Sequence, residues 1–74
     1  MQFTNLDSTA ISSVLINGTD VAITYKGSGK TYNYLTDVVD FAVQLQNVIE
    51  SNQSVGRFIN KAIKEDQTLR LTAV

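Results

Sequence analysis

The sequence predicts an α+β fold, in which an antiparallel three-stranded meander is followed by two helices packed on one of its faces. Two hairpin signals separate three strand-like stretches, and two stretches with helical periodicity come after them. No repeat and no linker-like composition divides the chain. With 74 residues, 43% of them hydrophobic, it has the size of one small domain with a modest core.

The first two strands are expected at residues 10–16 and 20–26. AISSVLI is rich in β-branched residues, and the Asn17-Gly18 pair that follows is the strongest short-range hairpin signal. DVAITYK then alternates large apolar residues with smaller or polar ones, as a strand with one buried face does. The large residues of this stretch are Val21, Ile23 and Tyr25.

GSGK, at residues 27–30, is expected to form the second hairpin turn, because its two glycines adopt positive φ without steric cost. This loop would pair Tyr25 with Tyr32 and Ile23 with Tyr34, with all the large residues on one face. A slip of one residue would move both later tyrosines to the opposite face. The third strand therefore runs through TYNYL.

GSGKT also resembles the end of a phosphate-binding loop, and that interpretation fails on two counts. The motif needs a glycine five positions before the glycine of GK, and this chain has Thr24 there. A helix should follow the loop, whereas β-rich TYNYL follows here. We therefore expect no bound nucleotide.

The first helix is expected to begin after Thr36, with Asp37 as its N-cap and Asp40 in its first turn. Val39 and Val43 lie outside its apolar stripe, so this helix either touches two neighbours or keeps an apolar surface for a partner. The stripe itself consists of Val38, Phe41, Ala42, Leu45, Val48 and Ile49.

The second helix is expected to begin at Ser54 as N-cap. One face is apolar and the opposite face carries three cations at i, i+4 and i+7. The apolar face comprises Val55, Phe58, Ile59, Ala62 and Ile63, and the cations are Arg57, Lys61 and Lys64.

The two ends of the chain differ in their pattern. Residues 1–9 carry isolated apolar residues and are expected to form a loosely docked arm. In residues 66–74, TLRLTAV alternates as a strand does, so a fourth strand is expected there. It would pair with a sheet edge of its own chain or of a second subunit.

The order of these features resembles the KTSC domain, found at the C-terminus of some lysyl-tRNA synthetases and as short proteins of bacteria and their phages. The resemblance covers about residues 8–65, and residues 10–65 are the expected KTSC-like domain. Where that family commonly has Val-Pro at the start of its first helix, this chain has Val38-Val39. The residues that carry the resemblance are Gly29, Tyr32, Tyr34, Ser54, Gly56, Phe58, Asn60 and Ile63, and we expect them to be mainly structural.

The resemblance implies a small non-catalytic binding module, with RNA as the suggested ligand. A basic patch formed by Arg57, Lys61 and Lys64, helped by Lys26 and Lys30, is the candidate surface for phosphates. Tyr32 and Tyr34 either stack bases, at about 1–3 kcal/mol per base, or fill the core. Their shared face with Ile23 favours the core.

The near-neutral net charge of −1 favours the alternative, a protein-interaction or homo-oligomerisation module. This module would act through residues 68–74 and through Val39 and Val43, which lie outside the apolar stripe. No enzyme, cofactor or metal site is expected, because the chain has no His and no Cys. No signal peptide and no apolar stretch long enough for a membrane span is recognised, so we expect the cytoplasm of a bacterium or of an infected host cell.

Overall fold

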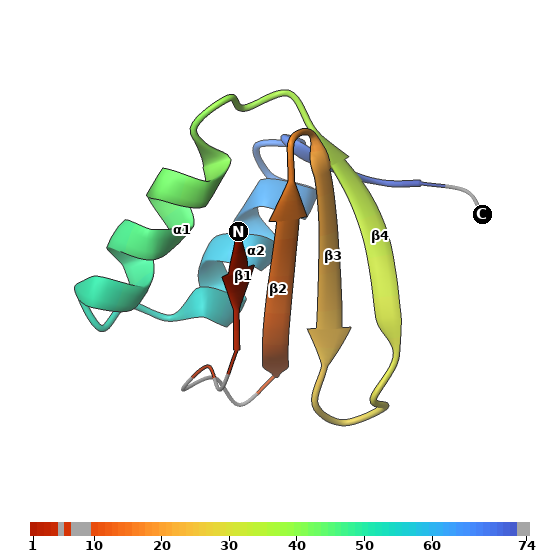
Figure 1. Cartoon of the computed structure of the whole chain (residues 1–74), viewed down its shortest axis with the longest axis vertical. Coiled ribbons are helices and arrows are strands. Elements are labelled where there is room, and N and C mark those ends of the chain that lie inside the picture. The colour runs from red at the N-terminus through yellow and green to blue at the C-terminus, as the bar shows by residue number, and fades with distance from the viewer. Residues whose placement is uncertain (5, 7–9, 73–74) are drawn as a thin grey trace.

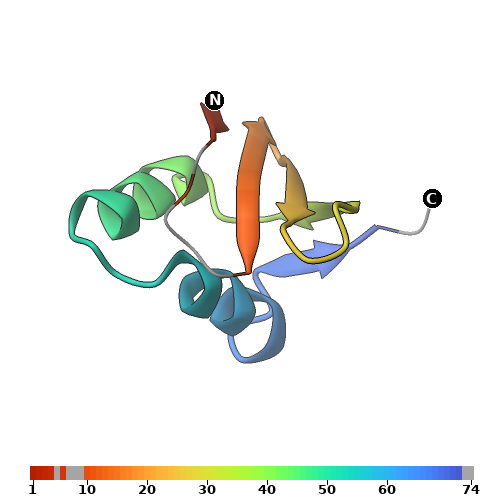
Figure 2. The same cartoon turned by 90° about the horizontal axis from the view of Figure 1, so that it is seen from below.

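The computed structural model describes residues 1–4, 6 and 10–72. One antiparallel sheet carries two helices on one of its faces (Figure 1 and Figure 2). In chain order the elements are β1 (Gln2–Phe3), β2 (Ile11–Asn17), β3 (Asp20–Tyr25), β4 (Thr31–Thr36), α1 (Phe41–Glu50), α2 (Val55–Lys64) and β5 (Leu69–Leu71). The spatial order β1-β2-β3-β4-β5 confirms the α+β class and adds a strand at each edge of the predicted meander.

Strand β2 begins with a β-bulge. Ile11 pairs with Tyr25 and Ser13 pairs with Thr24, so the residue between them has no partner of its own. A bulge adds one residue to one strand and shifts the alternation of its side chains. Ile11 and Val14, three positions apart, are therefore both buried in the core.

The β2–β3 hairpin closes through a two-residue loop. Asn17 pairs with Asp20, which leaves Gly18 and Thr19 between them. Gly18 has a φ of 63° and is the residue of this loop with positive φ, as in a type II′ turn. The predicted hairpin is confirmed, with Asn17 as the last residue of its first strand.

The β3–β4 hairpin differs in register from the prediction. Ile23 pairs with Tyr32 and Val21 with Tyr34, so the expected pairing of Tyr25 with Tyr32 is wrong by two residues. The cause is the position of the loop, because the Tyr25 amide already donates to the Lys30 carbonyl at 3.0 Å. An even shift leaves every side chain on its predicted face.

Helix α1 begins later than predicted. Asp37 is not its N-cap; the carboxylate instead accepts two hydrogen bonds of 2.6 Å from Arg70. The Val38 amide donates to the Thr36 hydroxyl at 3.1 Å, which holds the chain in a turn before the helix can start. The first helical residue is therefore Phe41, preceded by Asp40 as the N-cap.

The connection between the helices is fixed by local hydrogen bonds. Asn52, with a φ of 58°, follows the C-cap Ser51, and the next amide, of Gln53, donates to Val48 at 3.0 Å. This is the arrangement of a Schellman motif. Ser54 then accepts a hydrogen bond of 3.2 Å from the Arg57 amide, which confirms its predicted role as the N-cap of α2.

Both ends of the chain enter the sheet. Strand β5 pairs with β4 of its own chain, with Leu69 opposite Thr36 and Leu71 opposite Tyr34. The predicted C-terminal strand is therefore confirmed over residues 69–71, with its partner in the same chain; positions 73–74 lie outside the described residues.

The expected N-terminal arm is instead partly a strand. Gln2 and Phe3 pair with Leu15 and Val14 of β2, so β2 is not the sheet edge that a simple meander would make it. Leu6 is buried, and its carbonyl accepts a hydrogen bond of 3.3 Å from the Lys26 ammonium group. A strand of two residues is too short to give a visible alternation.

The core lies between the sheet and the helices, as alternation of the strand residues predicts. Val14 and Ile23 from the sheet and Leu45 from α1 have no exposed surface. The two tyrosines of β4 differ in exposure. Tyr34 is 7% exposed and belongs to the core, whereas Tyr32 is 40% exposed. The remaining buried apolar residues are Leu6, Ile11, Ile16, Val21, Phe41, Val55, Ile59, Ala62 and Leu69.

Candidate binding surface beside helix α2

The solvent-facing side of α2 carries three cations without a carboxylate partner. Arg57, Lys61 and Lys64 are exposed, while Val55 and Ile59 on the opposite side are buried. Throughout the part of the chain that the structure describes, the one ion pair joins Arg70 to Asp37. The guanidinium of Arg57 and the ammonium groups of Lys61 and Lys64 are therefore free to attract an anion.

These three cations border a common shallow hollow. Arg57, Lys61 and Lys64 line it together with Asn60 and Glu65. Their sequence spacing brings them to one side of the helix, since residues three and four apart are neighbours there. Glu65 is the single acid at this hollow, at its C-terminal end. The three α2 cations are hereafter called the basic face.

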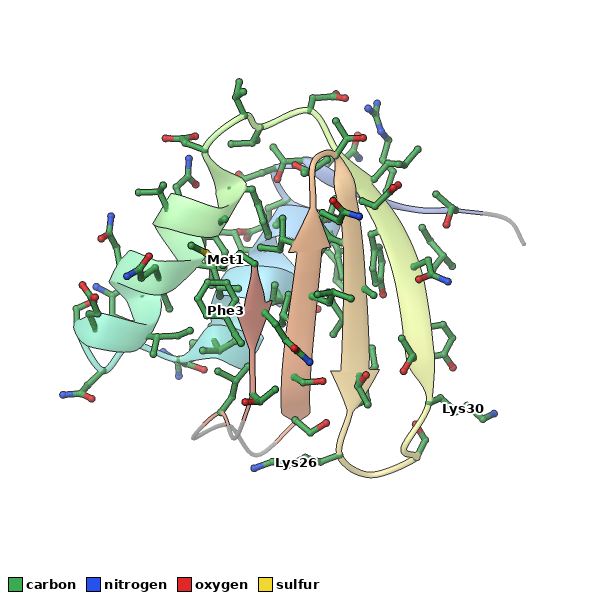
Figure 3. All side chains as sticks on the ribbon, in the orientation of Figure 1. Met1, Phe3, Lys26 and Lys30 are labelled. Carbon is green, nitrogen blue, oxygen red and sulfur yellow. The ribbon has the colours of Figure 1, made fainter. Side chains whose placement is uncertain are left out.

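The remaining predicted cations lie at the tip of the β3–β4 hairpin. Figure 3 shows Lys26 and Lys30 on this turn, at the opposite end of the sheet from the β2–β3 turn. Lys26 already donates to the Leu6 carbonyl, whereas Lys30 is exposed. Neither lysine lines the hollow of the basic face, so the structure groups the five predicted cations into two sets.

Three of the described acids lie at the end of the sheet opposite the β3–β4 tip. Asp20 begins β3, and Asp37 and Asp40 lie between β4 and α1, at the end of the sheet opposite the β3–β4 tip (Figure 1). Glu65 and Asp66 end α2, next to the connection to β5 at this same end. The net charge of −1 is therefore spread unevenly: three acids gather at one end of the sheet, while Glu65 and Asp66 directly follow Lys64 of the basic face.

A groove runs between α2 and the strands. Its strand side contains Ile11 and Tyr25, and its helix side contains Asn60 and Ile63. Arg57 lines this groove and also the hollow of the basic face, so the two surfaces are continuous. The other lining residues are Ala10, Ser54, Gly56 and Ile59.

Tyr25 is the aromatic residue that lines the groove. Its ring meets the Tyr32 ring edge to face, with centroids 5.6 Å apart. Its hydroxyl is 3.1 Å from the Tyr34 hydroxyl. Burial and then this hydrogen bond raise the pKa of the Tyr25 phenol above its ordinary value. The phenol therefore stays neutral at physiological pH and serves for hydrogen bonding and ring contact.

The residues that carry the KTSC resemblance have distinct positions. Gly29 adopts a φ of 67° in the β3–β4 turn, and its amide donates to the Tyr25 carbonyl at 2.9 Å. Phe58 packs against Phe41 of α1, with ring centroids 5.4 Å apart. Ser54 caps α2. These three roles are structural, as expected.

Gly56, Asn60 and Ile63 line the groove. That these three residues are mainly structural stays a prediction, and the sequence analysis assigned Tyr25 only to a strand. The missed signal is the position of Tyr25 as the last residue of β3, where it is only partly buried. Sequence periodicity indicates a face but not the point at which a neighbouring helix stops covering it.

GSGKT forms the β3–β4 turn and the start of β4. The Lys30 amide donates to the Ser28 hydroxyl at 3.2 Å, and the Thr31 hydroxyl is hydrogen-bonded to that of Thr24 at 2.8 Å. A strand follows the turn, so no helix N-terminus points at it.

ATP with magnesium should therefore leave the amide resonances of residues 27–31 unchanged in a titration followed by NMR. The reason is that the turn lacks both the glycine and the helix that a phosphate loop requires. Saturable shifts of these resonances at micromolar ATP would contradict the expectation. GTP at the same concentrations is the matched control for a general nucleotide effect.

Comparison of the chain with family models, with curated proteins and with solved structures finds no match. The KTSC resemblance thus stays a prediction from the residues that carry it. Across the described residues, no helix is both long enough and apolar enough to cross a membrane. Residues 1–4, 6 and 10–72 contain no cluster of three or more acidic side chains suited to hold a metal ion.

Proposed function

We propose that this protein is a small non-catalytic binding module of the KTSC type that binds RNA through the basic face of α2. The observation that carries the proposal is the row of Arg57, Lys61 and Lys64, exposed and without ion-pair partners. A partner that presents phosphates along a chain is complementary to such a row. A single acid, Glu65, lines the hollow beside the three cations, so the local charge is positive in spite of the net charge of −1, which supports the same ligand.

The strength of this interaction should depend on salt. Each neutralised phosphate contributes about 0.7 to 0.9 to the slope of log affinity against log salt concentration, so three contacts predict a slope of roughly −2 to −3. Fluorescence anisotropy with labelled 12-nucleotide RNA at several salt concentrations measures this slope. We expect the triple variant Arg57→Gln/Lys61→Gln/Lys64→Gln to lose it.

The triple variant should remain folded, because glutamine has a helix propensity close to that of lysine and arginine. Lys61 and Lys64 lie in the last turn of α2, where their loss removes a modest favourable interaction with the helix dipole. Arg70→Gln, at the acidic end of the molecule, is the matched control and should leave RNA affinity unchanged. Equal affinities of the wild-type chain and the triple variant would refute a role for the basic face.

A second candidate function is a protein-interaction or homo-oligomerisation module. Val39, in the segment before α1, is fully exposed, and Val43 on α1 is more than half exposed. Val39 and Met1 border a common hollow with Phe41, so the exposed apolar surface is continuous with the N-terminal strand. If the chain binds no RNA and its mass in sedimentation equilibrium rises with concentration, this function is the better explanation.

A further inference from the structure

The sheet presents one aromatic ring that the helices leave uncovered. Tyr32 alternates in phase with Tyr34, so it faces the helix side of the sheet, yet it is 40% exposed. The β3–β4 hairpin extends beyond both helices, as Figure 1 shows. Tyr32 lies opposite Ile23, near the hairpin end of β4, whereas Tyr34 lies farther along β4 in the core, opposite Val21 and beside Leu71 of β5. The register pairs of β4 with β5 include Tyr34 but not Tyr32, and Tyr32 is the more accessible of the two.

Tyr32 is connected to the groove through Tyr25. The two rings meet edge to face at 5.6 Å, and Tyr25 forms part of the groove wall. Opposite this wall, α2 presents Asn60 and Ile63. Arg57 borders the groove and both neighbouring hollows on the outer side of α2. Aromatic surface, an amide and a free guanidinium therefore occur on one continuous path.

We infer that the groove selects single-stranded RNA, with one unpaired base stacked on Tyr32 and the adjoining phosphates on Arg57 and the rest of the basic face. This inference rests on the proposed function and specifies its ligand. Exposed aromatic rings next to cations are the usual means of holding single strands, since every base has a face that can stack. The Asn60 amide offers both a donor and an acceptor to a base edge in the groove.

A duplex suits this arrangement less well. Its bases are stacked on each other and paired, so none can lie against Tyr32 without being extruded from the helix. The basic face could still contact duplex phosphates. We therefore expect Tyr32 to provide the preference for unpaired bases and the basic face of α2 to provide the affinity for phosphates. Substitutions of Tyr32 and of the basic face should change these two properties independently.

The test uses three fluorescein-labelled 12-nucleotide probes: oligo(A), an RNA duplex and an abasic strand with the same number of phosphates. Tyr32→Ser should weaken oligo(A) binding by about 5- to 150-fold, the range for loss of one stacked base. It should leave the abasic strand and the duplex unaffected. Tyr32→Phe keeps the ring and should retain wild-type affinity for oligo(A).

Leu35→Ser is the matched control. Leu35 lies on the same strand as Tyr32 and is also 40% exposed. Because it is three residues away and successive side chains of a strand alternate, it lies on the opposite face of the sheet. The substitution Leu35→Ser removes an apolar side chain of similar exposure, so a general loss of stability would affect Tyr32→Ser and Leu35→Ser alike. Thermal unfolding followed by circular dichroism verifies that each variant is folded.

The outcomes separate this inference from the proposed function. If Tyr32→Ser leaves oligo(A) affinity unchanged while the triple variant of the basic face loses it, the inference is wrong and the proposed function stands. If Tyr32→Ser weakens all three probes, or Leu35→Ser has the same effect, Tyr32 stabilises the fold and the inference is again overturned. If none of the probes binds the wild-type chain, the proposed function fails as well.

Discussion

Replacing Tyr34 with alanine should destabilise the fold by about 3–5 kcal/mol, the usual range for truncating a large aromatic side chain in a core. Tyr34 is 7% exposed and lies opposite Val21 in the sheet. Its hydroxyl contacts that of Tyr25. The free energy of unfolding in urea, followed by circular dichroism, measures the effect. Because a domain of this size has a total stability of only a few kcal/mol, the variant could be unfolded without denaturant.

Two further variants keep this prediction testable if Tyr34→Ala does not fold. Tyr34→Phe retains the ring and removes one hydrogen bond, so it should cost only about 0.5–1.5 kcal/mol. Tyr32→Ala truncates the exposed tyrosine of the same strand and should cost clearly less than Tyr34→Ala. A Tyr34→Ala protein as stable as wild type would show that this ring is not part of the core.

The faces of the strands could be predicted from sequence, whereas the exact pairing could not. Alternation of Val21, Ile23 and Tyr25 identifies a buried face whatever the partner residue is. The β3–β4 register depends on which residues close the loop, and two glycines allow more than one closure. An even shift leaves the faces intact, which explains why Tyr34 is in the core in spite of the wrong register.

The start of α1 depends on a contact between distant parts of the chain. Asp37 is a reasonable N-cap by local rules. In the structure it binds Arg70, 33 residues later, and Thr36 turns the chain through its hydroxyl. Local sequence rules rank capping residues but contain no information on a competing tertiary partner. The cap of α2 was predictable because Ser54 has no such competitor and bonds three residues ahead.

The candidate site was predictable to a similar extent. Helical spacing alone places Arg57, Lys61 and Lys64 on one side of α2, and the structure has all three exposed. The groove was not predictable, because it arises where the last residue of β3, Tyr25, meets the Asn60 side of a helix far along the chain. The different exposure of Tyr32 and Tyr34 depends on how the elements around β4 are assembled, on which alternation along one strand gives no information.

Deleting residues 67–74 should unfold the protein at every concentration tested. The deletion removes β5, and with it Leu69, which is 1% exposed and fills the core next to α2. Loss of a buried leucine side chain alone costs about 2–5 kcal/mol. The truncation also removes the backbone pairing of β5 with β4 and leaves that edge exposed to water and to other chains. The ion pair of Arg70 with Asp37 is exposed and adds little.

Single substitutions on β5 separate packing from pairing. Leu69→Ala should cost about 2–5 kcal/mol, whereas Leu71→Ala, on a side chain 62% exposed, should cost well under 1 kcal/mol and serves as the matched control. Because β5 pairs within its own chain, these losses should not depend on protein concentration. If the truncated protein instead becomes a folded monomer while the full chain sediments as a dimer, the strand is exchanged between chains. A truncated protein with the stability and mass of an intact monomer would show that β5 contributes nothing to the fold.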